Sequence, residues 1–116
     1  MKIQNIIKPR VRLSFGSTTS LGNFSYGPGI AGLCRGVSED GSLNRAAKEM
    51  NMAYSKAWRI IKNTEEAIGV ELLDRQGAHG STLTEEGLIL LSTYDQLEQE
   101  INEFAEKRLK EILEGR

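Results

Sequence analysis

The side chains best suited to chemistry cluster in one short stretch, where the cations Lys56, Arg59 and Lys62 follow the hydroxyl groups of Tyr54 and Ser55. In a helix of 3.6 residues per turn, Ser55, Arg59 and Lys62 share the outer side, Lys56 flanks it, and Tyr54 belongs to the same exposed first two-thirds. Arginine can form a forked pair of hydrogen bonds with guanine, and lysine and hydroxyl groups suit phosphates. The pattern therefore predicts a surface for nucleic acid, unless it is an ordinary solvated helix face.

The opposite side of this stretch has the composition of a core face. It consists of Ala57, Ile61, Thr64 and Ile68, with Ile60 at its edge. Trp58 lies on the flank, where we expect it to pack against a neighbouring element with its indole N–H at the surface. The sequence predicts an amphipathic helix that rests on the domain and turns its cations outward.

A shorter helix is predicted directly before this one. Ser42 is a good N-cap, because its hydroxyl can accept a hydrogen bond from the first-turn amides, and it is also a candidate DNA contact. Asn51 suits the turn that follows, since asparagine tolerates the left-handed conformation. The small side chains of Ala46 and Ala47 let the two helices cross closely. Residues 42–69 thus have the pattern of a helix-turn-helix, whose second helix can enter the major groove of DNA.

The segment after Gly69 predicts a β-wing. Leu72 and Leu73 would lie in its first strand, and residues 82–84 in the returning strand. Arg75 and His79 would then reach phosphate or the minor groove, although a solvated loop residue is an equal interpretation for His79. One histidine without grouped ligands does not predict a metal site.

A long final helix is predicted from about residue 85 to residue 113, capped by Thr84. Its apolar stripe steps by three and four residues through Leu90, Tyr94, Leu97, Ile101 and Phe104. A domain of this size cannot cover so long a stripe, so we expect a second copy of the chain to cover the rest as a homodimer. A free C-terminal helix with a frayed end is the alternative.

The beginning of the chain predicts a tail, a β-hairpin and a helix. Residues 1–10 form the tail, while residues 11–15 and 23–26 alternate with the period of half-buried strands. Pro28 suits the first turn of a helix. The apolar stripe of that helix is formed by Ile30, Leu33, Cys34 and Val37.

Charge is divided between the two halves of this 116-residue chain, whose length fits one domain. Residues 1–63 hold ten Lys and Arg against three Asp and Glu, and residues 64–116 hold five against thirteen. A basic front half suits an anionic partner, whereas the acidic half suits a solvated helix surface.

Several classes of protein find no support in the sequence. One cysteine, Cys34, leaves no intrachain disulfide, and we expect it to be a buried small hydrophobe. No apolar run approaches the ~20 residues of a membrane span, and no signal peptide is apparent, so a cytoplasmic protein without a membrane partner is expected. Neither a Ser-His-Asp arrangement nor a Walker loop indicates an enzyme, and no cofactor is expected.

Five runs of the sequence carry a family resemblance. They are Gly41-Ser42-Leu43, Ala46-Ala47-Lys48, Tyr54-Ser55-Lys56-Ala57-Trp58, Leu72-Leu73-Asp74-Arg75 and Leu83-Thr84-x-x-Gly87. Over about residues 11–112 the chain resembles the DNA-binding domain of ModE-type molybdate-responsive regulators, which is similar to the winged helix-turn-helix of LysR-type regulators. The resemblance implies a dimer that binds operator DNA.

The chain also departs from that family in three places. Its wing is shorter and less basic than is usual, and Ala53 replaces the usual Ser or Thr cap of the recognition helix. The oxyanion-binding domains of full-length members do not follow, so binding of molybdate or another oxyanion is not supported for this chain.

The sequence as a whole predicts a mainly α fold with a small β component. A winged helix-turn-helix with an N-terminal β-hairpin is expected over residues 11–84, followed by a dimerisation helix over residues 85–116. The expected function is that of a sequence-specific transcriptional regulator that binds double-stranded DNA as a dimer. The alternative is a winged helix that serves as a protein-interaction module without DNA binding, with the acidic helix as its surface.

Overall fold

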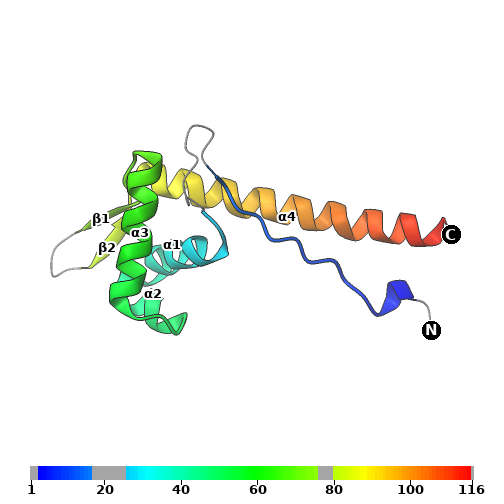
Figure 1. Cartoon of the computed structure of the whole chain (residues 1–116), viewed down its shortest axis with the longest axis horizontal. Helices are drawn as coiled ribbons and strands as arrows, with labels where there is room; N and C mark the ends of the chain where they lie inside the picture. The colour runs from blue at the N-terminus through cyan, green and yellow to red at the C-terminus, as the bar shows by residue number, and fades with distance from the viewer. Residues whose placement is uncertain (1–2, 17–25, 76–79, 116) are drawn as a thin grey trace.

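The computed structural model describes residues 3–16, 26–75 and 80–115, apart from the side chains of Gln4 and Arg75. Its elements are η1 (Ile3–Asn5), α1 (Pro28–Asp40), α2 (Leu43–Glu49), α3 (Tyr54–Ile68), β1 (Leu73–Arg75), β2 (Ser81–Leu83) and α4 (Glu85–Glu114). The first three α-helices gather at one end of α4, and the other end of α4 projects well beyond them (Figure 1). The predicted mainly α fold with a small sheet is confirmed. No helix of the described residues has both the length and the apolarity needed to cross a membrane.

Local signals close the helix-turn-helix as the sequence predicts. The Ser42 hydroxyl accepts a hydrogen bond from the Arg45 amide at 3.2 Å, which caps α2. Asn51 has a φ of 55° in the turn before α3. The helices α1 and α2 approach closely because Gly36 has no side chain: a Cβ atom there would lie 2.5 Å from the Cβ of Ala46.

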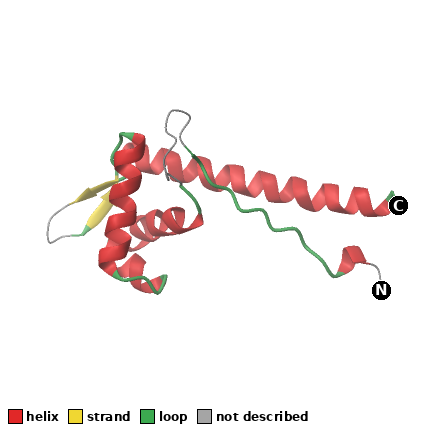
Figure 2. Ribbon diagram, viewed as in Figure 1, coloured by secondary structure: helices red, strands yellow, loops and turns green. Residues whose placement is uncertain are grey.

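The predicted wing is present as a two-stranded antiparallel sheet (Figure 2). Its strands pair Leu73 with Leu83 and Arg75 with Ser81. The Ser81 amide also donates to the Gly41 carbonyl at 3.0 Å, which attaches β2 to the end of α1. The tip of the wing, residues 76–79, lies outside the described residues.

The start of α4 is joined to the wing by one threonine. The Thr84 hydroxyl accepts from the Gly87 amide at 2.9 Å, as expected of an N-cap, and donates to the Glu71 carbonyl at 2.6 Å. Gly87 packs against this connection, because a Cβ atom there would lie 2.3 Å from the Leu72 carbonyl oxygen. These contacts fix the direction in which α4 leaves the wing.

The core lies between α1, α2, α3 and the first part of α4. Its buried hydrophobic residues are Tyr26, Ile30, Ala31, Leu33, Cys34, Val37, Leu43, Ala46, Ala47, Ala57, Ile61, Leu72, Leu73, Leu91 and Tyr94. Cys34 is therefore buried as predicted, and burial raises the pKa of its thiol to about 11. The ring of Phe15 packs against the rings of Tyr26 and Tyr94, with centroid distances of 5.9 and 5.5 Å.

The N-terminal region differs from the prediction in two ways. Residues 11–14 form no strand, and the expected hairpin is reduced to one bridge between Phe15 and Tyr26 in the described chain. The remainder of the hairpin, residues 17–25, lies outside the described residues. The segment before Phe15 runs beside α4, because Lys8, Val11 and Leu13 bond to that helix.

Candidate nucleic-acid interface

The predicted recognition helix is α3, and its two faces differ as the sequence indicates. Ala57, Ile61 and Thr64 are buried against the body of the domain. All five candidate side chains of the helix are exposed: Tyr54, Ser55, Lys56, Arg59 and Lys62. Ser55, Arg59 and Lys62 share the outer face with Lys56 at its flank, and they offer donors for base edges and phosphates. Tyr54 is the first residue of the helix, and it lies seven residues before Ile61 on the side of the core face.

One cation of this surface is held in position by its neighbours. The Lys62 ammonium lies 5.0 Å from the centroid of the Trp58 ring and 3.8 Å from a Glu65 carboxylate oxygen. Trp58 itself is half-buried and packs against the core, as predicted. A cation over the face of an aromatic ring is attracted by the ring, which restricts where the ammonium group lies. Lys62 is therefore presented at a defined place on the helix.

The N-termini of α2 and α3 are capped differently. Ala53 provides no side-chain cap for α3, as its sequence predicts. Ser42 is half-buried, and its oxygen is engaged in capping α2. A hydroxyl group that accepts one hydrogen bond can still donate its proton, so Ser42 remains chemically able to bind a phosphate oxygen.

The two wing candidates cannot be placed by their side chains. Arg75 belongs to β1 by its backbone, and its side chain lies outside the described residues. His79 lies outside them altogether. In the described part of the chain, no three His, Cys, Asp or Glu side chains are grouped as metal ligands.

Glu65 is a structural residue that the sequence analysis missed. Its side chain is 8% exposed, and its carboxylate accepts hydrogen bonds from the amides of Leu72 and Leu73 at 2.7 and 3.2 Å. It thereby fixes the end of α3 to the start of the wing. The signal was present, because Glu65 follows Ile61 by four residues and so falls on the buried face of the helix.

The predicted dimer stripe on α4 divides into two parts. Tyr94 is 1% exposed and belongs to the core of its own chain, so its assignment to a surface between two copies is corrected. Its hydroxyl donates to the Leu13 carbonyl at 2.8 Å. Leu90 and Ile101 are half-buried, whereas Leu97 and Phe104 are 40% and 57% exposed. The exposed part of the stripe lies on the projecting half of the helix.

A known protein family and two transcriptional regulators resemble part of this chain. Residues 33–88 match the family model described as the bacterial regulatory helix-turn-helix protein of the LysR family. The HTH-type transcriptional regulator CrgA of Neisseria meningitidis is 51% identical over 51 residues, which are 44% of this chain and 17% of CrgA. The HTH-type transcriptional regulator TdcA of Escherichia coli is 37% identical over 65 residues, which are 56% of this chain and 20% of TdcA. The chain thus spans about a fifth of the length of these relatives.

Two solved structures share its fold. The BenM DNA-binding domain in complex with benA site 1 DNA is 26% identical, with a TM-score of 0.58 over 74% of this chain and 94% of that one. The CbnR DNA-binding domain in complex with DNA is 24% identical, with a TM-score of 0.57 over 71% and 92%. These matches concern LysR-type domains, and the closer resemblance to ModE-type regulators stays a prediction from the sequence.

Proposed function

We propose that this chain is a transcriptional regulator that binds specific sites on double-stranded DNA, because residues 33–88 match the LysR-family helix-turn-helix model. The observation that carries the proposal is the outer face of α3, where polar and cationic side chains are exposed on the second helix of the motif. The second helix of a helix-turn-helix is the one that enters the major groove.

The proposed roles follow from the chemistry of each side chain. Tyr54, Ser55 and Arg59 are assigned to base edges, since arginine can bind guanine through two hydrogen bonds. Phosphate contacts, which position the protein without specifying sequence, are assigned to the remaining candidates, Ser42, Lys56, Lys62, Arg75 and His79.

We also propose that the regulator acts as a homodimer. Leu97 and Phe104 expose apolar surface on the projecting half of α4, with Leu90 and Ile101 beside them. A two-fold interface can bury the same stripe from both copies and would present two recognition helices to two half-sites.

The test is to select genomic fragments that the protein retains and to measure their binding in shift assays across a salt series. Binding should weaken steeply with salt. Arg59→Ala with Lys62→Ala should lose affinity and sequence preference, while Lys107→Gln with Arg108→Gln, two cations near the far end of α4, should bind as the parent does. Retained binding by the α3 variant would refute the assignment of the recognition face. Absence of any salt-dependent binding would instead favour the protein-interaction module.

A further inference from the structure

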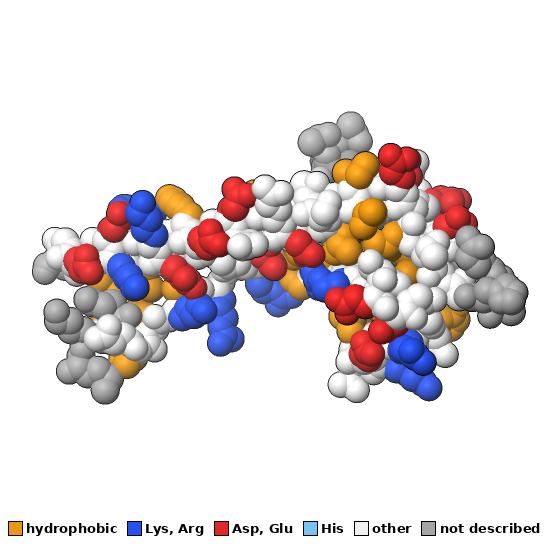
Figure 3. Space-filling model, turned by 180° about the vertical axis from the view of Figure 1, so that it is seen from behind, with side chains coloured by type: hydrophobic (Ala, Val, Ile, Leu, Met, Phe, Trp, Pro, Cys, Tyr) orange, Lys and Arg blue, Asp and Glu red, His pale blue; other side chains and the backbone are white. Residues whose placement is uncertain are grey.

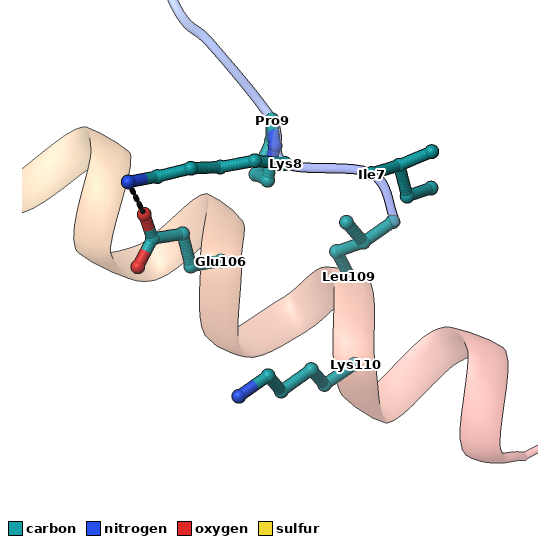
Figure 4. Close-up of a pocket in the computed structure, with 6 residues that line it drawn as sticks. All are labelled: Ile7, Lys8, Pro9, Glu106, Leu109 and Lys110. Carbon is teal, nitrogen blue, oxygen red and sulfur yellow. Dashed lines mark ion pairs between the residues drawn. The ribbon is translucent and has the colours of Figure 1, made fainter. Parts of the chain in front are cut away.

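A cationic N-terminal segment runs along α4, outside the helix-turn-helix. We call residues 6–15 the basic arm; it contains Lys8, Arg10 and Arg12 and no Asp or Glu. Its contacts with α4 are Lys8 Nζ to Glu106 Oε1 at 3.3 Å, the Val11 amide to Asn102 Oδ1 at 3.0 Å and the Leu13 carbonyl to the Tyr94 hydroxyl at 2.8 Å. Residue numbers increase along the arm while those of its partners in α4 decrease, so the arm runs antiparallel to α4. Figure 4 shows the Lys8–Glu106 pair at the start of this contact.

The arm is extended, so successive side chains point to opposite sides of it. Leu13 and Phe15 are half-buried, whereas Arg10 and Arg12 are exposed. Residues two apart in an extended chain lie on one side and are ~6.6 Å apart, so the two guanidinium groups form a row. Neither arginine makes an ion pair with any residue that the structure describes.

The carboxylates of α4 on the arm side cancel this charge only in part. Asp95 is paired with Arg35 and Glu106 with Lys8, while Glu98 accepts a hydrogen bond from the neutral Tyr94 hydroxyl and keeps its charge. Glu100 and Glu103 accept only from the neutral amides of Gln96 and Gln99, one turn earlier. At 3.6 residues per turn, both of these carboxylates fall on the half of α4 that faces away from the arm. Glu100 and Glu103 are therefore on the side opposite the exposed arginines, and Glu98 is the carboxylate that faces the arm without an ion pair to any residue that the structure describes.

The arm crosses α4 beside the helix-turn-helix body. In Figure 1 the blue arm passes in front of the long helix, and its N-terminal part lies on the same side of that helix as α1 and α2. Seen from behind, in Figure 3, Lys and Arg side chains gather below the middle of α4, beside the body. Arg10 and Arg12 are exposed on either side of Val11, which is bonded to Asn102 of α4, so a duplex held by α3 that extends beside α4 would meet them.

We propose that the basic arm is a second DNA-binding surface, in which Arg10 and Arg12 bind phosphates of the duplex that α3 engages. The inference rests on the proposed DNA-binding function. The arm adds electrostatic affinity without base contacts, and its attachment to α4 sets its distance from α3. Arginine suits this role because its charge is permanent and its planar group can bind two phosphate oxygens.

The experiment compares salt dependence in the full-length chain. Arg10→Gln with Arg12→Gln removes two exposed cations without touching the core. With a labelled duplex of mixed sequence, the slope of log Kobs against log salt should shrink by ~1.8 per bound chain, at ~0.9 per phosphate contact. Between ~50 and ~200 mM salt this corresponds to a ~12-fold smaller loss of affinity. The matched control, Lys107→Gln with Arg108→Gln, should keep the parent slope.

Three outcomes would overturn the inference. An unchanged slope in the arm variant, with binding abolished by Arg59→Ala and Lys62→Ala, would leave the proposed function standing and remove the arm from it. An equal change in the control would mean that any cation of the chain has the same effect. In a third outcome, the parent chain is a dimer and the arm variant a monomer in sedimentation velocity without DNA, while the salt slope of DNA binding per chain is unchanged. This outcome would assign the arm to contact with a second copy of the protein. Failure of the parent chain to bind DNA would refute the proposed function itself.

Discussion

The helix-turn-helix body and the projecting half of α4 are stabilised in different ways. Every buried hydrophobic residue of the described chain lies between Tyr26 and Tyr94. Beyond Tyr94, the large apolar side chains Leu97, Phe104 and Ile112 are 40% to 57% exposed, and individual polar contacts join the helix to the arm. The body therefore folds around its own core, whereas the projecting helix is left with surface that another molecule can cover.

The sharpest test of this difference makes one substitution in each region. Leu33→Ala removes a fully buried side chain and should lower the free energy of unfolding by about 4 kcal/mol, from lost burial and a cavity. Leu97→Ala makes the same chemical change at a 40% exposed site and should cost less than about 1 kcal/mol. Urea unfolding at a protein concentration that keeps the chain monomeric measures both. Equal losses would show that α4 is part of one continuous core.

The second test concerns the join between α3 and the wing. Glu65→Ala would leave the buried amides of Leu72 and Leu73 without an acceptor, so we expect a loss of about 3 kcal/mol in unfolding free energy. Glu103→Ala is the control on the projecting helix, where the carboxylate is exposed. Hydrogen exchange at Leu72 and Leu73 should accelerate in the Glu65 variant only. Unchanged exchange there would contradict the role given to this carboxylate.

The third test uses pH to probe the core. Burial raises the pKa of Cys34 to about 11 in the folded chain, above the ordinary thiol value of 9.0. The unfolded chain therefore loses this proton first as the pH rises, and the stability that Cys34 contributes is complete below pH 9 and is lost towards pH 11. The loss should be about 3 kcal/mol, at ~1.36 kcal/mol per pKa unit. Thermal melts of the parent and of Cys34→Ala should differ in slope over this window, and parallel curves would contradict the burial argument.

The smallest effect on the folded chain itself is expected from Phe104→Ala, because the ring is 57% exposed. Unfolding free energy should change by less than about 0.5 kcal/mol in the monomer. If the projecting helix is the dimer surface, the same variant should raise the dimer dissociation constant about tenfold or more, since aromatic residues dominate such interfaces. Sedimentation velocity over a concentration series separates the two effects. A change in monomer stability with no change in association would assign Phe104 to its own chain.

Local patterns gave most of the fold before the structure was known. The stripe of Ile30, Leu33, Cys34 and Val37 predicts α1, and Ser42 and Thr84 cap the helices that follow them. The outer face of α3 was predicted for the same reason, since helical spacing decides which residues share a side. These features depend on contacts within a few residues of one another, so the sequence contains the information needed to place them.

Long-range contacts were not predictable in this way. The alternation of residues 11–15 favours a strand, but only Phe15 pairs with an extended neighbour, Tyr26, while the backbone of Val11 and Leu13 bonds to Asn102 and Tyr94 of α4. Tyr94 lies in the apolar stripe of a long helix, and only the packing of Phe15 and Tyr26 beside it makes it a core residue rather than a surface one. Neither outcome follows from the periodicity of a single element.

The sequence by itself determined the helix-turn-helix, its caps and the cationic face of α3, because backbone capping and helical periodicity act locally. The tertiary structure decided which residues those elements bury and which charges remain unpaired. Glu65 became buried there, and Asp95 and Glu106 of α4 found cationic partners while Arg10 and Arg12 stayed exposed. The Arg35–Asp95 and Lys8–Glu106 pairs join residues distant in sequence within ~4 Å, and only the packing of α4 against α1 and the arm brings them together.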